Sequence, residues 1–443
     1  MAIKLSDHFT YGRLIRFALP SIAMMIFTSI YSVVDGLFVS NLVGTAALAA
    51  VNLIFPLAAA FAAVGFMLGT GGAALVAKTM GEGDQVRADR LFSFIIAIGF
   101  IGGVAFSGIA LVVLPLFLSA LGASGELMEL AMAYGRILAF AIPVYMLANI
   151  FQSFFIAAEK PHVGLAVMAV AGVANIVLDY FFIAVFGWGI AGAAWATLIG
   201  QVLAAVIPVV YFFRSATARL HFARPLVDFR ALGKTCVNGS SELMTEVAAS
   251  IVATLYNYQL MIYVGTEGVA AYGVIMYVNF IFTAIFFGYA MGTGPIVSYH
   301  YGAQHHYEMK NLLAKSLILI GIASIVMVSL SQTFAQSLVS LFVGYDAALV
   351  ALTVHGFRIY ALSFLFCGFT IYGSAFFTAL NNGKISALIA FIRTLILETS
   401  TVMLLPIFFG INGIWSAIIV AEVAALLLTI FFLVKYRKRY QYA

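Results

Sequence analysis

The chain has 443 residues, of which 64% are hydrophobic and only 9% are charged, and its formal net charge is +5. Soluble domains carry about 25% charged residues. The composition therefore excludes a soluble enzyme or binding module and indicates a polytopic membrane protein. Cys236 and Cys367 have no motif spacing, so they predict neither a disulfide nor a metal site.

Twelve apolar stretches are long enough to cross a bilayer as helices. In chain order they are 17–39, 46–72, 92–118, 133–157, 163–186, 189–213, 238–263, 269–295, 316–342, 355–380, 386–409 and 413–434. They predict an all-α integral membrane protein with two lobes of six helices each. The boundaries follow as an N-lobe at 1–213, a cytoplasmic linker at 214–236 and a C-lobe at 237–443.

The basic residues predict the orientation of these helices. Nineteen of the 22 Lys and Arg residues lie in segments on the same side of the membrane as the N-terminus, and the loops on the other side have none. By the positive-inside rule, both termini are cytoplasmic. The basic residues are thus signals of topology, and we expect no nucleic-acid partner. The remaining three, Arg136, Arg358 and Arg393, fall inside predicted helices.

The second half of the chain resembles the first at an offset of about 222 residues. Gly69-Thr-Gly71 matches Gly292-Thr-Gly294, and Arg136 matches Arg358. Five such matches occur in the same order with nearly constant offset, which indicates a duplication. Because six helices are an even number, both halves insert with the same orientation, and a binding cavity is expected between them.

Two aspartates lie in stretches that are predicted to span the membrane. Asp35 follows Tyr31 by one helical turn, and Asp179 follows Asn175 by one turn. Embedded carboxylates usually face a water-filled path or a proton relay, and burial disfavours their charged form. A proton or a cation is therefore expected to decide their charge. The alternative is that both are structural and bond to neighbouring hydroxyl and amide groups.

Four segments make the chain resemble the multidrug and toxic compound extrusion (MATE) family, over about residues 10 to 435. They are 175–183 with 189–197, 33–39 preceded by Pro20, and 294–303. The resemblance implies a bent first helix, with Pro20 permitting the bend. It also implies efflux of cationic or amphiphilic compounds in exchange for H⁺ or Na⁺, with no other cofactor.

The resemblance further implies a cation-coupling site in the N-lobe. Its members in this sequence are Asp35, Asn175, Asp179 and Thr197, with Asn149 nearby. Some family members also carry coupling carboxylates in the C-lobe, but the predicted helix 355–380 has no acidic residue. The repeat supports the same conclusion. Asp35 maps near Tyr256 or Asn257 and Asp179 maps near Thr401, so neither aspartate has an acidic counterpart in the C-lobe. Coupling is therefore predicted for the N-lobe alone.

A substrate cavity is predicted from acidic, aromatic and methionine side chains, which suit varied cationic compounds. The candidates are Tyr31, Glu242, Glu246, Tyr256, Met276 and Tyr277. The two glutamates are four residues apart near one end of their helix, so they meet either a substrate or interfacial water. The aromatic residues and Met276 serve equally well as packing between helices.

Two further groups of polar residues are interpreted as structural. Arg393 is expected to pair with Glu422 or Glu398, although Arg393 and Glu398 are five apart and so do not share one face of an α-helix. The second group is interpreted as a solvated loop with no metal; its members are His300, His305, His306 and Glu308.

The sequence as a whole predicts a secondary antiporter for amphiphilic cations, a non-enzyme whose two lobes rock to give alternating access. We expect it to be a monomer in the inner membrane of a prokaryote. One alternative is a lipid-linked oligosaccharide flippase of the same superfamily, which would need a basic cavity for its pyrophosphate. A membrane-embedded enzyme is the other, but no nucleophile–base pair or metal constellation is evident.

Overall fold

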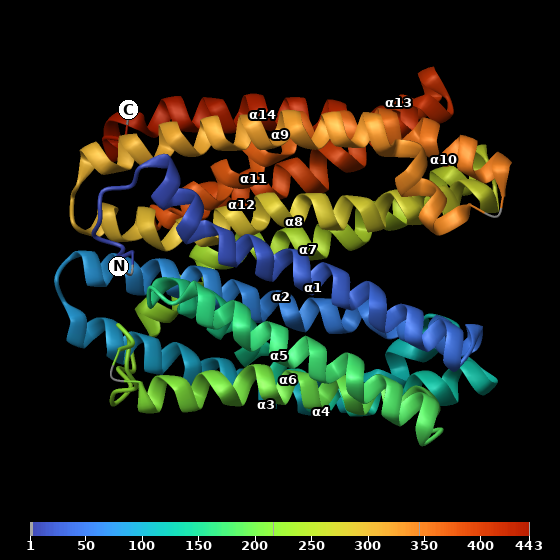
Figure 1. Ribbon diagram of the computed structural model, residues 1–443, viewed down its shortest axis with the longest axis horizontal. Coiled ribbons are helices and arrows are strands. Elements are labelled where there is room, and N and C mark those ends of the chain that lie inside the picture. The colour runs from blue at the N-terminus through green and yellow to red at the C-terminus, as the bar shows by residue number, and fades with distance from the viewer. Residues whose placement is uncertain (1–2, 216, 345, 443) are drawn as a thin grey trace.

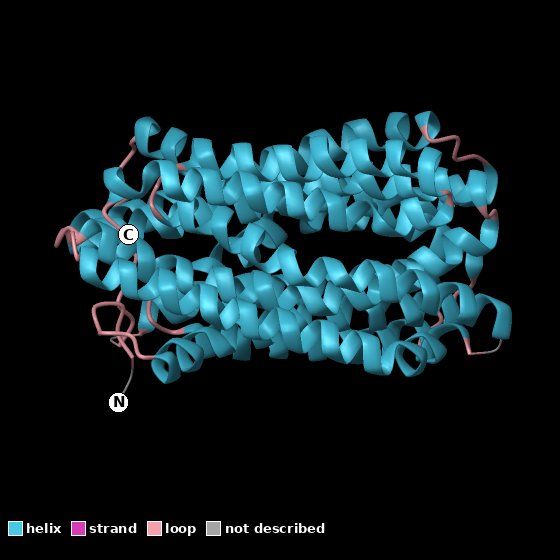
Figure 2. Cartoon of the chain, turned by 90° about the horizontal axis from the view of Figure 1, so that it is seen from above, coloured by secondary structure: helices cyan, strands magenta, loops and turns pink. Residues whose placement is uncertain are grey.

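The computed structural model describes residues 3–215, 217–344 and 346–442, and every regular element in that part of the chain is helical. The helices run along the long axis of the molecule as two bundles, one above the other in Figure 1. Loops gather at the two ends of the bundles (Figure 2). Both chain termini lie at the same end, which we call the terminal end; the opposite one is the far end (Figure 1).

The first bundle is the N-lobe. Its helices are α1 (Tyr11–Leu42), α2 (Thr45–Gly81), α3 (Gln85–Ala120), α4 (Gly125–Ala157), α5 (Pro161–Asp179) and α6 (Gly189–Arg214). A π-helical turn, η1 (Tyr180–Val185), continues α5 directly after Asp179. The fifth crossing of the membrane is thus α5 and η1 together.

The second bundle is the C-lobe. Its helices are α7 (Phe229–Tyr263), α8 (Thr266–Gly302), α9 (His306–Val343), α10 (Ala347–Tyr360), α11 (Phe364–Ala379), α12 (Gly383–Phe391), α13 (Thr399–Phe409) and α14 (Ile411–Tyr440). A 3₁₀ turn, η2 (Ala361–Ser363), joins α10 to α11. A π-helical turn, η3 (Ile392–Glu398), joins α12 to α13. Each of these joined pairs is one crossing, so this lobe also has six.

The predicted all-α membrane fold with two lobes of six helices is confirmed. Eleven crossings in the described part of the chain are both long and apolar enough to span a bilayer. The twelfth, α7, has 35 residues and is long enough, but it is more polar because several of its side chains face a cavity. The observed helices extend beyond the predicted apolar stretches by up to two or three turns, since polar residues continue them into the interfaces.

The linker between the lobes is shorter than the predicted 214–236. It spans 215–228, because α7 already begins at Phe229. The Asp228 side chain accepts hydrogen bonds from the backbone N–H groups of Arg230 and Ala231, which caps the helix before its apolar stretch begins. Hydropathy alone misses this polar first part of α7.

The linker is also fastened to the N-lobe along the start of α3. The backbone N–H of Ala223 donates to the Ser93 hydroxyl at 2.9 Å, and that of His221 donates to Asp89 at 3.1 Å. Gln85 donates to the carbonyl oxygen of Arg219 at 2.8 Å. The linker therefore moves with the N-lobe rather than hanging freely between the lobes.

Backbones of the two lobes touch where α2 crosses α7 and α8. A Cβ atom on Gly239 of α7 would lie 1.9 Å from the carbonyl oxygen of Met67, and one on Gly81 of α2 would lie 2.0 Å from that of Tyr299. Only glycine permits such an approach. The second crossing is at the terminal end, so the lobes are closed against each other there.

The residues ahead of α1 also bridge the lobes at the terminal end. The backbone N–H of Leu5 donates to Glu159 of the N-lobe at 2.7 Å, and that of Phe9 donates to Glu308 of α9 at 2.9 Å. His8 Nδ1 lies 2.6 Å from the other oxygen of Glu308. Leu5 and Phe9 are completely buried. The N-terminal segment is therefore an integral part of the closed contact.

The interpretation of the histidine-rich group as a solvated loop is wrong for two of its members. His300 belongs to the last turn of α8 and is buried, with its ring edge-on to Phe9, and Glu308 is buried beneath the N-terminal segment. That segment covers both, which local sequence cannot reveal. Within the described residues, no group of three or more His, Cys, Asp or Glu side chains is placed to hold a metal ion.

We predict that Gly239→Val destabilises the protein. The added side chain overlaps the backbone of α2, and overpacking of this kind costs about 1–3 kcal/mol of the free energy of unfolding. Thermal denaturation of the purified protein in detergent measures the effect. Gly233→Val is the matched control, since a Cβ on this glycine of the same helix meets nothing within 4 Å. Equal melting temperatures for the two variants would contradict the close contact between α7 and α2 at Gly239.

Candidate functional site

A cavity of about 640 Å³ lies between the two lobes. Its wall takes Met25 and Ser29 from α1 and Phe66 and Thr70 from α2, but most of it comes from the C-lobe. Apolar and aromatic side chains dominate, with a few acidic groups among them. This composition suits an amphiphilic ligand of drug size.

The cavity is closed toward the terminal end and extends toward the far end. Along α8 its wall runs from Val269, near the far end, to Pro295. Beyond Pro295 the last turns of α8 pack against α2, where a Cβ on Gly302 would lie 2.1 Å from the carbonyl oxygen of Lys78. The lobe contact at the terminal end thus separates the cavity from that side of the molecule.

Four carboxylates and one guanidinium line this cavity. They are Glu242, Glu246, Glu398, Glu422 and Arg393. The two α7 glutamates are four residues apart and both belong to the wall, so they meet the cavity rather than only interfacial water. Glu246 is exposed to it and Glu242 is half-buried. The charged groups of the cavity are therefore predominantly acidic.

Arg393 pairs with Glu422, one of the two partners that the sequence left open. Its Nε and Nη2 atoms donate to Oε1 of Glu422 at 2.8 and 2.6 Å. The Thr370 hydroxyl donates to the other oxygen of Glu422 at 2.7 Å. Glu422 is 1% exposed, so this buried carboxylate is balanced in charge and satisfied in hydrogen bonds.

The expectation that Arg393 and Glu398 lie on different faces is wrong. Both belong to η3, a π-helical turn, and both line the cavity. In a π-helix the hydrogen bonds run from i to i+5 and the turn is wider, so residues five apart lie much closer to one face than in an α-helix. The α-helical spacing therefore does not hold in this turn.

Of the other predicted cavity residues, two lie on the cavity wall and two do not. Tyr256 of α7 and Met276 of α8 belong to the cavity wall. Tyr277 does not, because it points about 100° away around α8 from Met276 and stacks on Phe342 of α9, with ring centroids 5.7 Å apart. Tyr31 is not on the wall either; its ring lies 6.4 Å from that of Phe27.

The two aspartates of the N-lobe meet away from this cavity. Asp35 of α1 and Asp179 at the end of α5 lie within hydrogen-bonding reach of each other. Asp179 is 0% exposed, and within the described part of the chain neither of its oxygens, nor Oδ1 of Asp35, accepts a hydrogen bond. Two facing carboxylates repel unless a proton or a cation lies between them.

Asn175 shares α5 with Asp179, and Thr197 lies on the neighbouring helix α6. Asn175 is one turn before Asp179 on α5, and both its amide atoms are buried without a hydrogen-bond partner among the described residues. Gly200 of α6 permits close approach, since a Cβ there would lie 3.2 Å from that of Asn175. Thr197 is three residues before Gly200 and half-buried. Carboxylate and amide oxygens without partners fit a proton or a hard cation.

Asn149 lies elsewhere in the N-lobe. Its amide nitrogen donates to the carbonyl oxygen of Ala62 on α2 at 3.4 Å, and Gly65 and Gly69 of α2 pack against it. It therefore holds α2 and α4 together, and no contact in the described residues joins it to the aspartates.

Pro20 lies where α1 meets the opposite lobe. The helix is continuous through it, from Tyr11 to Leu42. On either side of the proline, α1 packs against glycines of α8: a Cβ on Gly288 would lie 2.5 Å from Cα of Ile22, and one on Gly292 would lie 3.1 Å from that of Ala18. A bend at Pro20 would therefore change the contact between the lobes.

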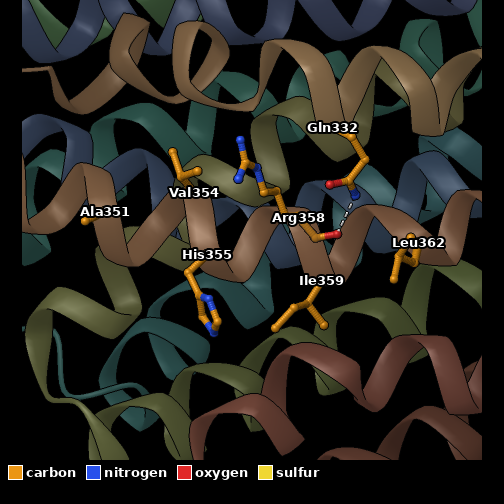
Figure 3. Close-up of a pocket in the computed structure, with 7 residues that line it drawn as sticks. All are labelled: Gln332, Ala351, Val354, His355, Arg358, Ile359 and Leu362. Carbon is orange, nitrogen blue, oxygen red and sulfur yellow. Dashed lines mark hydrogen bonds between the residues drawn. The ribbon is translucent and has the colours of Figure 1, made fainter.

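A second pocket, of about 420 Å³, lies on the C-lobe between α9 and α10 (Figure 3). Its polar residues are Gln332, His355 and Arg358, and Gln332 donates to the backbone oxygen of Arg358 at 2.8 Å. Its wall has no acidic residue among those that the structure describes, and it is separate from the central cavity. Such a site does not favour a cation.

The duplicated sequence matches one family of known proteins twice. The profile described as MatE matches residues 20–181 and 242–403, two segments of equal length whose starts are 222 residues apart. This chain belongs to the MatE family. It is therefore a membrane transporter and not an enzyme, and the predicted family and internal repeat are confirmed.

Relatives and solved structures agree with this assignment. The MatE transporter described here is 24% identical to the multidrug export protein MepA of Staphylococcus saprophyticus over 93% of this chain and 91% of that protein. It is also 24% identical to MepA of Staphylococcus aureus, over 94% and 92%. Its fold matches a structure described as the outward-facing conformation of a multidrug resistance MATE family transporter, with a TM-score of 0.93, 21% identity and 98% of each chain covered.

Two parts of the MatE transporter's sites were missed in the sequence. Tyr134 of α4 is buried and interacts electrostatically with both Asp35 and Asp179. Tyr272 of α8 belongs to the wall of the central cavity. The chain has 21 tyrosines, and neither composition nor spacing distinguishes these two from the others.

We predict that Arg393→Met strongly destabilises this MatE transporter, because it leaves the carboxylate of Glu422 buried without a counter-charge. Breaking one side of a buried pair costs about 3–5 kcal/mol, whereas replacing both partners is much less costly. The double variant Arg393→Met, Glu422→Leu should therefore melt well above the single one. The exposed Arg136→Met is the control. If Arg393→Met has the same melting temperature as this control, the ion pair does not stabilise the C-lobe.

Proposed function

We propose that this MatE transporter exports amphiphilic organic cations in exchange for H⁺ or Na⁺. The observation that carries the proposal is the charge of the central cavity, whose wall has four carboxylates and a single guanidinium that is already paired. An acidic, largely apolar cavity favours ligands that are both cationic and hydrophobic. The MepA relatives are described as multidrug export proteins, which supports export of varied organic compounds.

The coupling ion binds in the N-lobe. Asp35, Asp179 and Asn175 present buried oxygens that lack protein partners, and these atoms can take either one shared proton or a small cation. Without such an ion, two charged carboxylates face each other in an apolar surrounding, which is unfavourable. A bound proton or cation therefore lowers the free energy of any state in which α1 and α5 bring the two aspartates together.

Transport follows from movement of the lobes about this site. The terminal end is cytoplasmic by the distribution of basic residues, so the described state is closed to the cytoplasm and open outward. Cargo leaves from this state and ion binding at Asp35 and Asp179 follows. A bend of α1 at Pro20 then loosens its contact with α8 and permits the inward-open state. Exchange requires that the ion have different affinities for the two states.

A lipid-linked oligosaccharide flippase is the second candidate, and the charges disfavour it. A pyrophosphate needs unpaired basic groups, yet Arg136 and Arg358 are not on the wall of the central cavity, and Arg393 is bound to Glu422. Both lobes and the cavity belong to one chain, so the proposed transporter works as a monomer. The proposed location is the cytoplasmic membrane of a prokaryote, which is the inner membrane where the cell has two.

We predict that Asp35→Asn and Asp179→Asn each abolish ion-driven export. Either change removes a carboxylate from the ion site, a loss worth about 1.5–3 kcal/mol and hence tenfold or more in affinity for the ion. The measurement is uptake of a fluorescent cation into everted membrane vesicles, with a pH or a Na⁺ gradient imposed separately. Only one gradient is expected to drive uptake in the unaltered protein.

The control for this experiment is Glu126→Gln, which changes an exposed acid at the far end of α4. It should transport like the unaltered protein. Full uptake by both aspartate variants refutes the coupling site. Uptake that persists when both gradients have been collapsed refutes ion exchange itself.

A further inference from the structure

The C-lobe has polar residues where the duplication places the counterpart of the N-lobe ion site. At the offset of 222 residues shown by the two matched segments, α1 corresponds to α7, while α5 and α6 correspond to the crossing α12–η3–α13 and to α14. The N-lobe site uses Asp35, Asn175 and Asp179 on the first two of these crossings. In the C-lobe the same crossings carry Tyr256 and Glu398.

Glu398 is a buried carboxylate without a partner of its own. It is 9% exposed and belongs to the wall of the central cavity. Its nearest opposite charge, Arg393, is already engaged by Glu422 through two hydrogen bonds. No hydrogen bond or ion pair to the Glu398 carboxylate occurs in the described part of the chain. When both carboxyl groups are ionised, Arg393, Glu422 and Glu398 together carry one net negative charge.

Two stacked tyrosines line the same cavity wall as this carboxylate. The rings of Tyr256 and Tyr272 are 4.8 Å apart between centroids and only 8° from parallel. Tyr256 belongs to α7, which packs against η3, the turn that carries Glu398. The Tyr256 hydroxyl is buried with no hydrogen-bond partner among the described residues. A carboxylate next to aromatic faces is the surrounding that proteins offer to alkylammonium and similar cations.

We propose that Glu398, Tyr256 and Tyr272 form the subsite that binds the charged group of the cargo, a monovalent organic cation. The inference rests on the proposed export of cations and specifies where their charge is held. The N-lobe aspartates lie off the cavity wall and serve the coupling ion, whereas Glu398 lies on it and serves the cargo. The duplicated sites have thus divided the two ligands of an exchanger between them.

The position of Glu398 distinguishes it from the other acids of the cavity. Glu422 is neutralised by Arg393. Glu246 precedes Tyr256 by ten residues on α7, so it lies roughly 15 Å closer to the terminal end. A small inorganic ion is strongly hydrated and prefers oxygen ligands, so aromatic faces offer it little, while a weakly hydrated organic cation binds both to the rings and to the carboxylate. This combination assigns the subsite to cargo rather than to the coupling ion.

The test is equilibrium binding of labelled tetraphenylphosphonium to the purified full-length protein, with no ion gradient. Neutral triphenylphosphine oxide serves as a competitor of similar bulk. Glu398→Gln keeps the size of the side chain and removes its charge. It should lower the affinity for the cation about tenfold and leave the affinity for the neutral compound unchanged. Tyr272→Leu should lower cation affinity severalfold.

Glu126→Gln is again the control and should bind like the unaltered protein, and a melting curve for each variant shows that it is folded. If Glu398→Gln keeps the full preference for the cation, or loses both compounds equally, the subsite is wrong while export of cations stands. If the unaltered protein has no preference for the cation, the proposed function fails and the subsite with it.

Discussion

A carboxylate inside a membrane must meet a proton, a cation or a donor, and the buried acids of this protein meet this requirement in three ways. Glu422 is satisfied by Arg393 and Thr370 and so is purely structural. Asp35 and Asp179 face each other, so a proton or a cation between them would relieve their repulsion. Glu398 faces the cavity, where a cationic ligand can balance it. In the proposed mechanism the three solutions correspond to stability, coupling and cargo binding.

The closed state depends on glycines rather than on attraction between side chains. At the crossings of α2 with α7 and α8, Gly239 and Gly81 let backbones touch, and the N-terminal segment adds hydrogen bonds to both lobes. Such backbone contacts form in only one relative position of the helices and are lost completely when the helices separate. This favours two discrete states, as alternating access requires. Because residues 219–223 of the linker are fastened to α3, the proposed hinge is in the helices, at Pro20 of α1.

Much of this architecture can be read from the sequence, because hydropathy, basic residues and the repeat act over whole helices. The Arg393–Glu422 pair follows as well, since a buried arginine needs an acid nearby. Other features depend on local geometry that no pattern encodes. The π-helical turn brings Glu398 over Arg393, and the position of Tyr277 on α8 turns it away from the cavity. The burial of Glu308 depends on a segment 299 residues earlier in the chain.

In the proposed exchanger the two duplicated lobes divide the ligands between them, with the coupling ion in the N-lobe and the cargo against the C-lobe. The most direct measurement is a crystal structure of the full-length protein with tetraphenylarsonium, because anomalous scattering locates the arsenic atom. We predict the arsenic in the central cavity, against Glu398 and the stacked rings of Tyr256 and Tyr272. An arsenic atom in the N-lobe, beside Asp35 and Asp179, would contradict the claim.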